Sequence, residues 1–268
     1  MNQRRMDPLW ERLRLEASEI ARREPFLEPL VDSCILGEEC YEDALATLLA
    51  MRLSEASLPA ASMRLMFAPL LRDPAVAEAS RRDLSAVVER DPAAQSVAVP
   101  FLHFKGFQSL QAYRISHQLW TSGRCDLAHY IQGRISTVYG LDFHPAAKVG
   151  AGILIDHGTG VVVGETATIG DNVSILQGVT LGGTGKQTGD RHPKIGNGVL
   201  LGAGAKVLGN IRVGEGSKVG AGSVVLHEVP PHCTVVGVPA RVVGTPRAQQ
   251  PALDMDQEIE IEFDNDHL

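Results

Sequence analysis

Two short stretches of the sequence place a histidine beside charged residues, and they are the first candidates for chemistry. One contains Asp156 and His157, and the other contains Asp190, Arg191 and His192. A neutral imidazole can accept a proton near pH 7, and a guanidinium can hold a carboxylate through two parallel hydrogen bonds. The stretches could therefore support proton transfer beside a bound carboxylate. On its own, however, His157 is more typical of a surface imidazole at a turn.

The elements that must position these residues follow a six-residue repeat. From about Leu141, hydrophobic residues recur at every sixth position, often followed by glycine: Val163, Ile169, Ile175, Leu181, Ile195, Leu201, Val207, Val213, Val219 and Val225. A first set, Val149, Ile155 and Val161, is offset by two residues. This period is typical of a parallel β-helix, whereas Gly-rich hairpins would need a period of two. We therefore predict a β-helix over residues 141–245, with glycine at its corners.

The repeat is interrupted once, between Leu181 and Ile195. The intervening residues GGTGKQTGDRHPK do not keep the six-residue step. An insertion in a solenoid is expected to form a loop outside the coil, where function often lies, and this one contains Arg191 and His192. Its GGTGK stretch resembles a phosphate-binding loop only superficially, because it lacks the required spacing and the strand–loop–helix context.

The residues before the repeat are expected to form helices, and we predict an all-helical domain over residues 1–140. Hydrophobic residues three or four positions apart give the first helix one apolar face. Asp-Pro pairs at positions 7, 73 and 91 predict three helix starts, since aspartate caps free N–H groups and proline fits the first turn. Further helices are expected at about 41–54, 74–89, 107–121 and 124–139.

Composition excludes several classes of protein. The net charge of −7 and the pI near 5.7 argue against general binding of nucleic acid. The first residues carry charge but lack the apolar core of a signal peptide, and no apolar run approaches the roughly 20 residues of a membrane span. The four cysteines form no CxxC pair. We therefore expect reduced thiols and a cytoplasmic location, without a membrane anchor.

Several motifs together carry a resemblance to a known family. They are RDPA at 90–93, FLHFKGFQSLQAYRISHQLW at 101–120, LDFHPAAKVG at 141–150, IDHGTGVVVGETATIG at 155–170, SILQGVTLGGTGK at 174–186, DRHPKIG at 190–196 and GVPARVVG at 237–244. With the helical half and the repeats, they resemble bacterial serine O-acetyltransferases over nearly the whole chain. The resemblance implies an α+β protein whose parallel β-helix is left-handed, although the general rule for β crossovers favours the right hand.

The resemblance also implies the reaction and the residues that perform it. The family transfers an acetyl group from acetyl-CoA to the hydroxyl of L-serine, in cysteine biosynthesis. His157 matches the general base and Asp142 the carboxylate that orients it. The other matches are Arg191 for the serine carboxylate, Asp91 and Asp156 for its ammonium, and His192 near the hydroxyl or the acyl centre. Asp91 has a competing structural role as a helix cap.

Acetyl-CoA is expected along the groove between two coils, as a co-substrate and without a metal. By the family pattern, the small residues beside its pantetheine arm are Gly183, Ala203 and Ala221. Lys218 and Arg241 could meet its phosphates, or they could be ordinary surface charges. Direct transfer is expected, because no cysteine lies in a motif that would demand a covalent intermediate.

The family further implies partners. The β-helices are expected to form a trimer, with active sites between neighbouring β-helices. Two trimers would pair into a hexamer through the helical domains. L-Cysteine is expected to be a feedback inhibitor. The acidic residues 246–268 are expected to form a flexible tail. In the family the C-terminus inserts into O-acetylserine sulfhydrylase and usually ends in isoleucine, whereas this chain ends in Leu268. The EIEIEF stretch of this tail alternates like a strand, which could add to a partner.

Three alternatives stay open at this point. The acceptor could be homoserine, a sugar or an antibiotic, although the long helical half favours serine. A β-helical zinc lyase would use histidines such as His227 and His232, which are five residues apart. A third possibility is a scaffold that docks a partner through its tail, and this role could coexist with catalysis.

Overall fold

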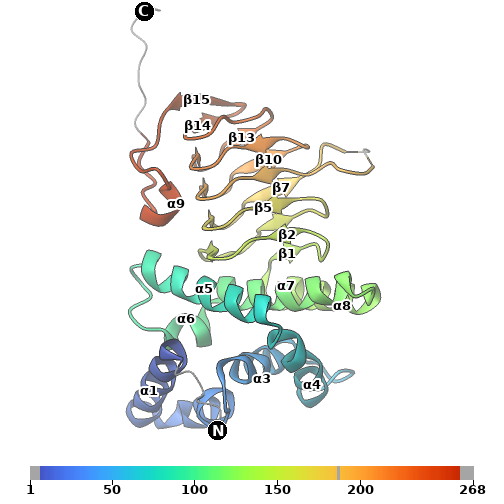
Figure 1. Cartoon of the computed structure of the whole chain (residues 1–268), viewed down its shortest axis with the longest axis vertical. Helices are drawn as coiled ribbons and strands as arrows, with labels where there is room; N and C mark the ends of the chain where they lie inside the picture. Colours follow the sequence, from blue (N-terminus) through green and yellow to red (C-terminus); the bar gives the residue numbers. More distant parts are fainter. Residues whose placement is uncertain (1–6, 186–187, 260–268) are drawn as a thin grey trace, which may run out of the picture.

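The computed structural model describes residues 7–185 and 188–259, in which a helical half is followed by a β-helix stacked on it (Figure 1). Two short segments, a 3-10 turn at Pro25–Leu27 and a π turn at Asp32–Leu36, flank α2. The helices of this half are α1 (Pro8–Arg23), α2 (Glu28–Val31), α3 (Tyr41–Leu53), α4 (Ala60–Leu71), α5 (Pro74–Arg90), α6 (Ala98–His103), α7 (Lys105–Thr121) and α8 (Cys125–Tyr139).

Two of the three Asp-Pro pairs begin helices, as predicted. The Asp7 carboxylate accepts hydrogen bonds from the first backbone N–H groups of α1, and the Asp73 carboxylate does the same for α5. The prediction for Asp91 was wrong, because Asp91 follows the last residue of α5. Its Oδ1 accepts from the backbone N–H of Ala93, 2.8 Å away, in a turn. An aspartate before proline therefore ended one helix here instead of starting the next.

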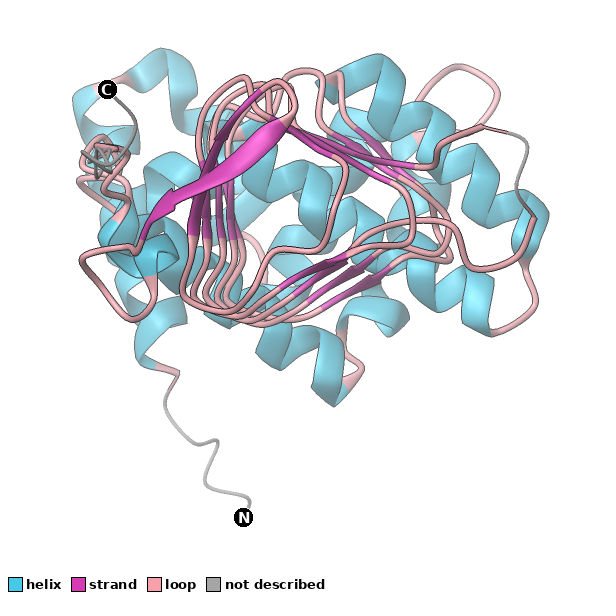
Figure 2. Ribbon diagram, turned by 90° about the horizontal axis from the view of Figure 1, so that it is seen from above, coloured by secondary structure: helices cyan, strands magenta, loops and turns pink. Residues whose placement is uncertain are grey.

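Short strands coil into a left-handed parallel β-helix with three flat faces, which Figure 2 shows end-on as a triangle. Sheet I contains β1 (Asp142–Phe143), β4 (Val162–Val163), β7 (Thr180–Gly182), β10 (Lys206–Leu208) and β13 (Val224–Val225). Sheet II contains β2 (Lys148–Val149), β5 (Thr168–Ile169), β8 (Lys194–Ile195) and β11 (Arg212–Val213). Sheet III contains β3 (Leu154–Ile155), β6 (Ser174–Ile175), β9 (Leu200–Leu201), β12 (Lys218–Val219), β14 (Thr234–Gly237) and β15 (Ala240–Gly244).

The hydrophobic residues of the six-residue repeat fill this coil. All ten members from Val163 to Val225 are buried, which confirms that they point inward. The smaller residues four positions after them, such as Ala167, Ala205 and Ser223, are also buried. Each coil contributes its inward side chains to the layer above and below it, so stacking forms one continuous core.

Only two intervals in β1–β13 depart from the six-residue step between strand starts. Strand β3 begins at Leu154 and β4 at Val162, eight positions later. Strand β7 begins at Thr180 and β8 at Lys194, fourteen positions later. The first of these turns contains His157, and the second contains Arg191 and His192. The residues that the sequence singled out for chemistry therefore lie where the chain leaves its regular path.

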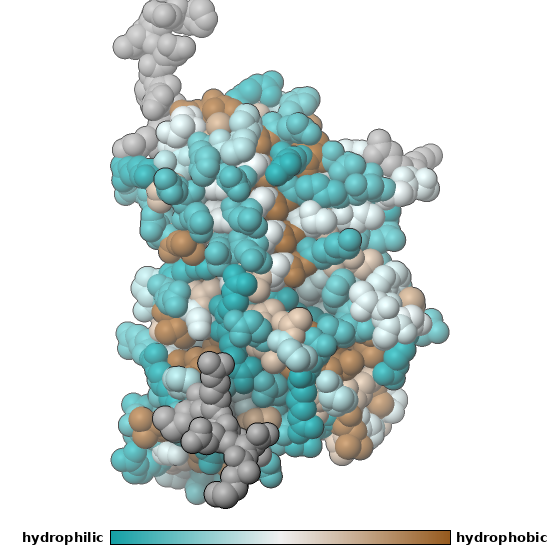
Figure 3. Space-filling model, viewed as in Figure 1, coloured by the Kyte–Doolittle hydropathy of each residue, from teal (hydrophilic) through white to brown (hydrophobic). Residues whose placement is uncertain are grey.

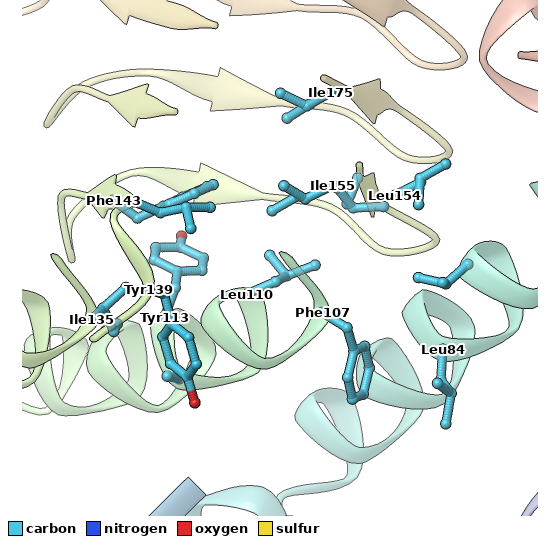
Figure 4. Close-up of a cluster of buried hydrophobic side chains, with 14 of the residues drawn as sticks. Leu84, Phe107, Leu110, Tyr113, Ile135, Tyr139, Phe143, Leu154, Ile155 and Ile175 are labelled. Carbon is cyan, nitrogen blue, oxygen red and sulfur yellow. The ribbon is translucent and has the colours of Figure 1, made fainter. Parts of the chain in front are cut away.

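The two halves meet through hydrophobic and charged contacts. Side chains of α5, α7 and α8 pack under the first coils of the β-helix (Figure 4). Beside them, a guanidinium nitrogen of Arg114 lies 2.7 Å from Oδ2 of the fully buried Asp83. Asp83 Oδ1 accepts from the backbone N–H of Ile153, and Arg114 donates to the carbonyl of Gly150. Breaking a buried ion pair leaves an uncompensated charge, so these bonds fix how the β-helix sits on the helices.

Gly106 allows α7 to approach the strand that precedes His157. A Cβ atom at this position would lie 2.1 Å from the carbonyl oxygen of Ile155. We expect Gly106→Ala to lower the free energy of unfolding by about 1–3 kcal/mol, because the two halves must separate. Gly133 in α8 is a matched control, since nothing lies within 4 Å of its Cβ position. Gly133→Ala should raise stability by about 0.5–1 kcal/mol. Denaturant unfolding that gave both variants the same sign would contradict this account.

The described part of the C-terminal segment packs on the β-helix, which differs from the flexible tail expected for all of 246–268. Helix α9 (Pro251–Asp254) buries Ala252, whose carbonyl oxygen accepts from the hydroxyl of Ser174 at 2.8 Å. The Lys218 ammonium donates to the carbonyl oxygens of Asp256 and Glu258. These contacts order the chain up to Ile259. Most of the EIEIEF stretch and Leu268 lie outside the described residues.

Candidate active site

The His157 edge of the β-helix joins sheet III to sheet I and is formed by the turns 156–161, 176–179, 202–205 and 220–223. His157 itself has a φ of +55°, a conformation that is uncommon for residues other than glycine and often occurs at functional sites. Three quarters of its side-chain surface is exposed, and its Nε2 lies 3.7 Å from Oδ1 of Asp156. The two extra residues of this turn therefore present the imidazole outside the coil.

Asp142 begins β1, directly below this turn. It pairs in register with Val162 of β4, and the neighbouring Leu141 packs beneath Gly158. Its Oδ1 accepts a hydrogen bond of 2.7 Å from the side-chain amide of Gln132. Among the described residues, no hydrogen bond joins Asp142 to His157. The structure thus places the predicted pair beside one another without direct contact.

Asp91 and Asp156 form a pair of carboxylates next to His157. Burial raises the pKa of Asp156, and the negative charge of Asp91 raises it further, against the opposing effect of His157. Asp91 reaches this position because α5 ends there, so its role at the end of a helix and its place in the site are compatible. Two neighbouring carboxylates that are partly removed from water favour a cationic partner.

The upper part of the same edge is built from small residues. The backbone N–H of Gly204 donates to the carbonyl of Gln177, and that of Gly222 donates to the carbonyl of Ala203. Gln177, Ala203 and Ala221 therefore occupy equivalent positions on successive coils. Gln177 lies one coil above His157, and its buried Oε1 has no hydrogen-bond partner in the described chain. Above Gln177, this edge presents only the small side chains of Ala203 and Ala221.

The His192 edge joins sheet I to sheet II and is formed by the turns 144–147, 164–167 and 209–211 and by the described residues 183–185 and 188–193. His192 is only 8% exposed, and its Nδ1 lies 2.9 Å from the hydroxyl of Thr166. Arg191 is held by Glu165, whose Oε2 accepts from the guanidinium at 2.6 Å. This hydrogen bond lowers the pKa of Glu165. Gly183 lies on the same edge, and its Cβ position is 3.7 Å from Nε2 of His192.

The predicted site residues thus form two clusters at opposite edges of sheet I. Asp91, Asp142, Asp156 and His157 share one edge, with Ala203 and Ala221 above them. Gly183, Arg191 and His192 share the other edge. Sheet I lies between them, so one chain does not bring the proton acceptor and the predicted carboxylate ligand together.

Comparison with known proteins identifies the family. A model of the N-terminal domain of serine acetyltransferases matches residues 9–112, and a model of bacterial transferase hexapeptide repeats matches residues 192–227. The serine acetyltransferase of Salmonella typhimurium is 50% identical over 253 residues, which cover 94% of this chain and 93% of the relative. The chain belongs to the serine acetyltransferase family.

Solved structures of the family agree with this assignment. A serine acetyltransferase in complex with cysteine has a TM-score of 0.92 and 48% identity, and the match covers 94% of this chain and 99% of that one. The serine acetyltransferase of Brucella abortus strain S19 in complex with coenzyme A has a TM-score of 0.89 and 48% identity, with coverage of 91% and 98%. The activity of this chain is accordingly that of the family, the acetyl-CoA-dependent acetylation of serine that begins cysteine biosynthesis.

Two residues assigned to coenzyme A from the family pattern lie apart from both clusters. Lys218 is in β12, on sheet III, where its buried ammonium is occupied by the carbonyl oxygens of Asp256 and Glu258. Arg241 is an exposed residue of β15, and its guanidinium contacts only the adjacent carbonyl of Ala240 among the described residues.

Three residues of the site were not anticipated from the sequence. Thr166 and Glu165 hold His192 and Arg191, and Gln177 lies above His157. The sequence could have indicated Gln177, because one coil at this level is twenty residues long and Gln177 follows His157 by twenty residues. Thr166 and Glu165 occupy an ordinary turn of the repeat, and only the returning loop gives them their partners.

Two absences concern the described residues alone. Over 7–185 and 188–259, no three His, Cys, Asp or Glu side chains are grouped so that they could hold a metal ion. Within the same ranges, none of the helices has the length and apolar character needed to cross a membrane. His227 and His232 therefore belong to no candidate metal centre among these residues.

Proposed function

We propose that this chain acetylates serine by direct transfer, with His157 as the general base. Its imidazole takes the proton of the serine hydroxyl as the oxygen attacks the acetyl carbonyl, and the tetrahedral intermediate then expels the thiolate of CoA. Asp142 stabilises the imidazolium after it approaches His157 in the complex with substrate, where catalytic hydrogen bonds commonly tighten. The exposed ring at the widened turn supports this role.

The remaining polar residues bind the two charged groups of serine. Asp91 and Asp156 receive its ammonium, since the raised pKa of Asp156 favours a cationic partner. Arg191 receives its carboxylate through guanidinium N–H groups beyond those that donate to Glu165 and to the carbonyl oxygen of Gly189, and these two bonds fix the plane of the group. His192 lies beside Arg191 and contacts the reacting end of the substrate.

The observation that carries the proposal is the separation of these residues on two edges of sheet I. A complete site forms when the His157 edge of one copy meets the His192 edge of the next. Such a head-to-tail contact closes into a ring, and we propose the trimer. Sheet I exposes Val162 between the edges, and a narrow column of hydrophobic residues runs along the β-helix in Figure 3. The helical domain, residues 1–140, would pair two trimers into a hexamer, and its Phe26 is 98% exposed.

Acetyl-CoA occupies the groove between the two edges in this proposal. Ala203 and Ala221 on one copy and Gly183 on the next leave room for the pantetheine arm. Lys218 and Arg241 are assigned to the CoA phosphates, which requires that Lys218 exchange its contacts with the C-terminal segment. L-Cysteine, which carries a thiol where L-serine carries a hydroxyl, is assigned to the serine site as inhibitor. In this proposal the enzyme is cytoplasmic, and its C-terminus binds O-acetylserine sulfhydrylase.

The test is the release of CoA thiol from acetyl-CoA in the presence of L-serine, with L-homoserine assayed in parallel. We expect release with serine, and at least about tenfold lower kcat/KM with homoserine, because one extra methylene costs about 1–3 kcal/mol in a fitted pocket. A preference for homoserine would keep the fold and the general base but overturn the acceptor. Release with neither amino acid would overturn the proposed function.

A further inference from the structure

The hydroxyl of Thr166 contacts three atoms of the Arg191–His192 pair. Its Oγ1 accepts from the backbone N–H of Arg191 at 3.0 Å and from that of His192 at 3.1 Å. The same oxygen lies 2.9 Å from Nδ1 of His192. Strand β5 pairs with β8 so that Thr168 faces Lys194, and Thr166 therefore lies one coil below His192. A single side chain thus holds the end of the connection between β7 and β8.

The hydrogen bonds around this hydroxyl indicate which ring nitrogen of His192 carries the proton. A threonine oxygen offers two lone pairs and one proton, and both lone pairs already accept backbone N–H groups. Its proton faces two acceptors, Nδ1 of His192 at 2.9 Å and the carboxylate of Asp190, whose pKa is lowered by hydrogen bonds from Lys194 and from this side chain. The backbone N–H of Thr166 donates to Nδ1, 3.1 Å away. Because a backbone N–H can only donate, Nδ1 must accept, and a neutral His192 carries its proton on Nε2.

The other ring nitrogen lies against two glycines, whose lack of a side chain makes room for the imidazole. A Cβ atom at Gly164 would lie 2.2 Å from Nε2, and one at Gly183 would lie 3.7 Å from it. Nε2 makes no hydrogen bond within the described chain, although the residue is more than nine-tenths buried. Burial lowers the pKa of His192, and the positive charge of Arg191 lowers it further. The remaining charged or titratable neighbours are Glu165, which acts in the opposite direction, and Lys194 and His144.

We propose that Thr166 is a positioning residue that holds His192 with its Nε2–H directed at an anionic oxygen of the substrate. That oxygen is either the serine carboxylate or the acetyl carbonyl as it becomes negative. This inference rests on the proposed function, and it divides the work between two histidines. His157 is free to accept a proton, whereas His192 donates a hydrogen bond and keeps its proton throughout the reaction.

The first test compares Thr166→Val with Thr166→Ser. Valine has the shape of threonine but lacks the hydroxyl, so the backbone N–H groups of Arg191 and His192 lose their acceptor. We expect kcat/KM for serine to fall about 100-fold, the loss that a displacement of about 1 Å commonly causes. Serine restores the hydroxyl and should remain within about threefold of the wild type. Equal activity of the valine variant and the wild type, or equal loss in both variants, would overturn the proposal.

Whether the loss of activity in Thr166→Val lies in KM or in kcat identifies the substrate oxygen that Nε2–H of His192 contacts. If Nε2–H binds the serine carboxylate, the loss in Thr166→Val lies mainly in KM for serine. If it binds the developing oxyanion, the loss lies mainly in kcat, with KM nearly unchanged.

The second test reads the tautomer directly and needs no turnover. Solid-state 15N spectra of the full-length protein labelled at histidine, with His192→Gln to assign the signal, should show unprotonated Nδ1 and protonated Nε2. A protonated Nδ1 would overturn the proposal even if the enzyme acetylates serine. If the wild type released no CoA with serine, the proposed function would fail, while the spectrum would still report whether Thr166 fixes the ring.

Discussion

His157→Asn should lower kcat for serine-dependent release of CoA by about 10²–10⁴-fold, the usual contribution of a general base. Asparagine tolerates the left-handed conformation that His157 adopts, so the turn keeps its shape. It offers hydrogen bonds but cannot take the proton of the serine hydroxyl. KM for acetyl-CoA should change little, because the small residues above His157 are untouched.

A matched control is present in the same β-helix. His232 also has a φ of +55° and lies at an exposed turn, far along the coil from the site. His232→Asn makes the same chemical change in the same backbone conformation, and we expect activity to stay within about twofold of the wild type. If the two variants lost activity equally, the loss at His157 would reflect the backbone of a turn, and the assignment of the base would be wrong.

The inactive variants His157→Asn and Arg191→Ala should regain activity when their chains assemble into mixed rings. A His157→Asn chain has an intact His192 edge, and an Arg191→Ala chain has an intact His157 edge. In rings of randomly mixed chains, about one quarter of the contacts join two intact edges. Unfolding and refolding the variants together at equal amounts should therefore recover about a quarter of wild-type activity, from two preparations that are each almost inactive.

The control for this experiment is a mixture with both defects on one edge. His157→Asn mixed with Asp156→Asn leaves no contact with an intact His157 edge, so no activity should return. Recovery in this control would mean that chains exchange by another route. A failure to recover in the His157 and Arg191 mixture, with assembly shown by light scattering, would place the whole site within one chain.

The coil of the β-helix was predictable because its period follows from packing alone. Each sixth residue must fill the interior, so the ten buried positions could be read from the sequence. The offset of two residues between Ile155 and Val163 was also visible. It marks the widened turn of His157, and the break after Leu181 marks the loop of Arg191. Interruptions of the repeat therefore coincide with the turns that carry the candidate residues His157 and Arg191.

Other features depended on contacts that a linear pattern does not contain. Asp91 follows α5 because the chain turns there toward the β-helix, and the Asp-Pro pair has the same form at either end of a helix. The role of Thr166 required that a loop from the next coil return onto it. The separation of His157 from Arg191 depended on which corner of the triangle each turn occupies, and the sequence period alone does not assign turns to corners.

The candidate site residues on the β-helix lie mainly in two interruptions of the repeat, whereas the regular coils provide the packing that stabilises the fold. On either side of the fourteen-residue interval, β8 still pairs with β5 and β11 without a change of register. The excursion can therefore be replaced as a unit by one of different length, while every layer of the interior keeps its neighbours. A graft between Gly182 and Lys194 would exchange the acceptor pocket and leave the thermal stability of the stack almost unaltered, so this scaffold is modular at the level of a single loop.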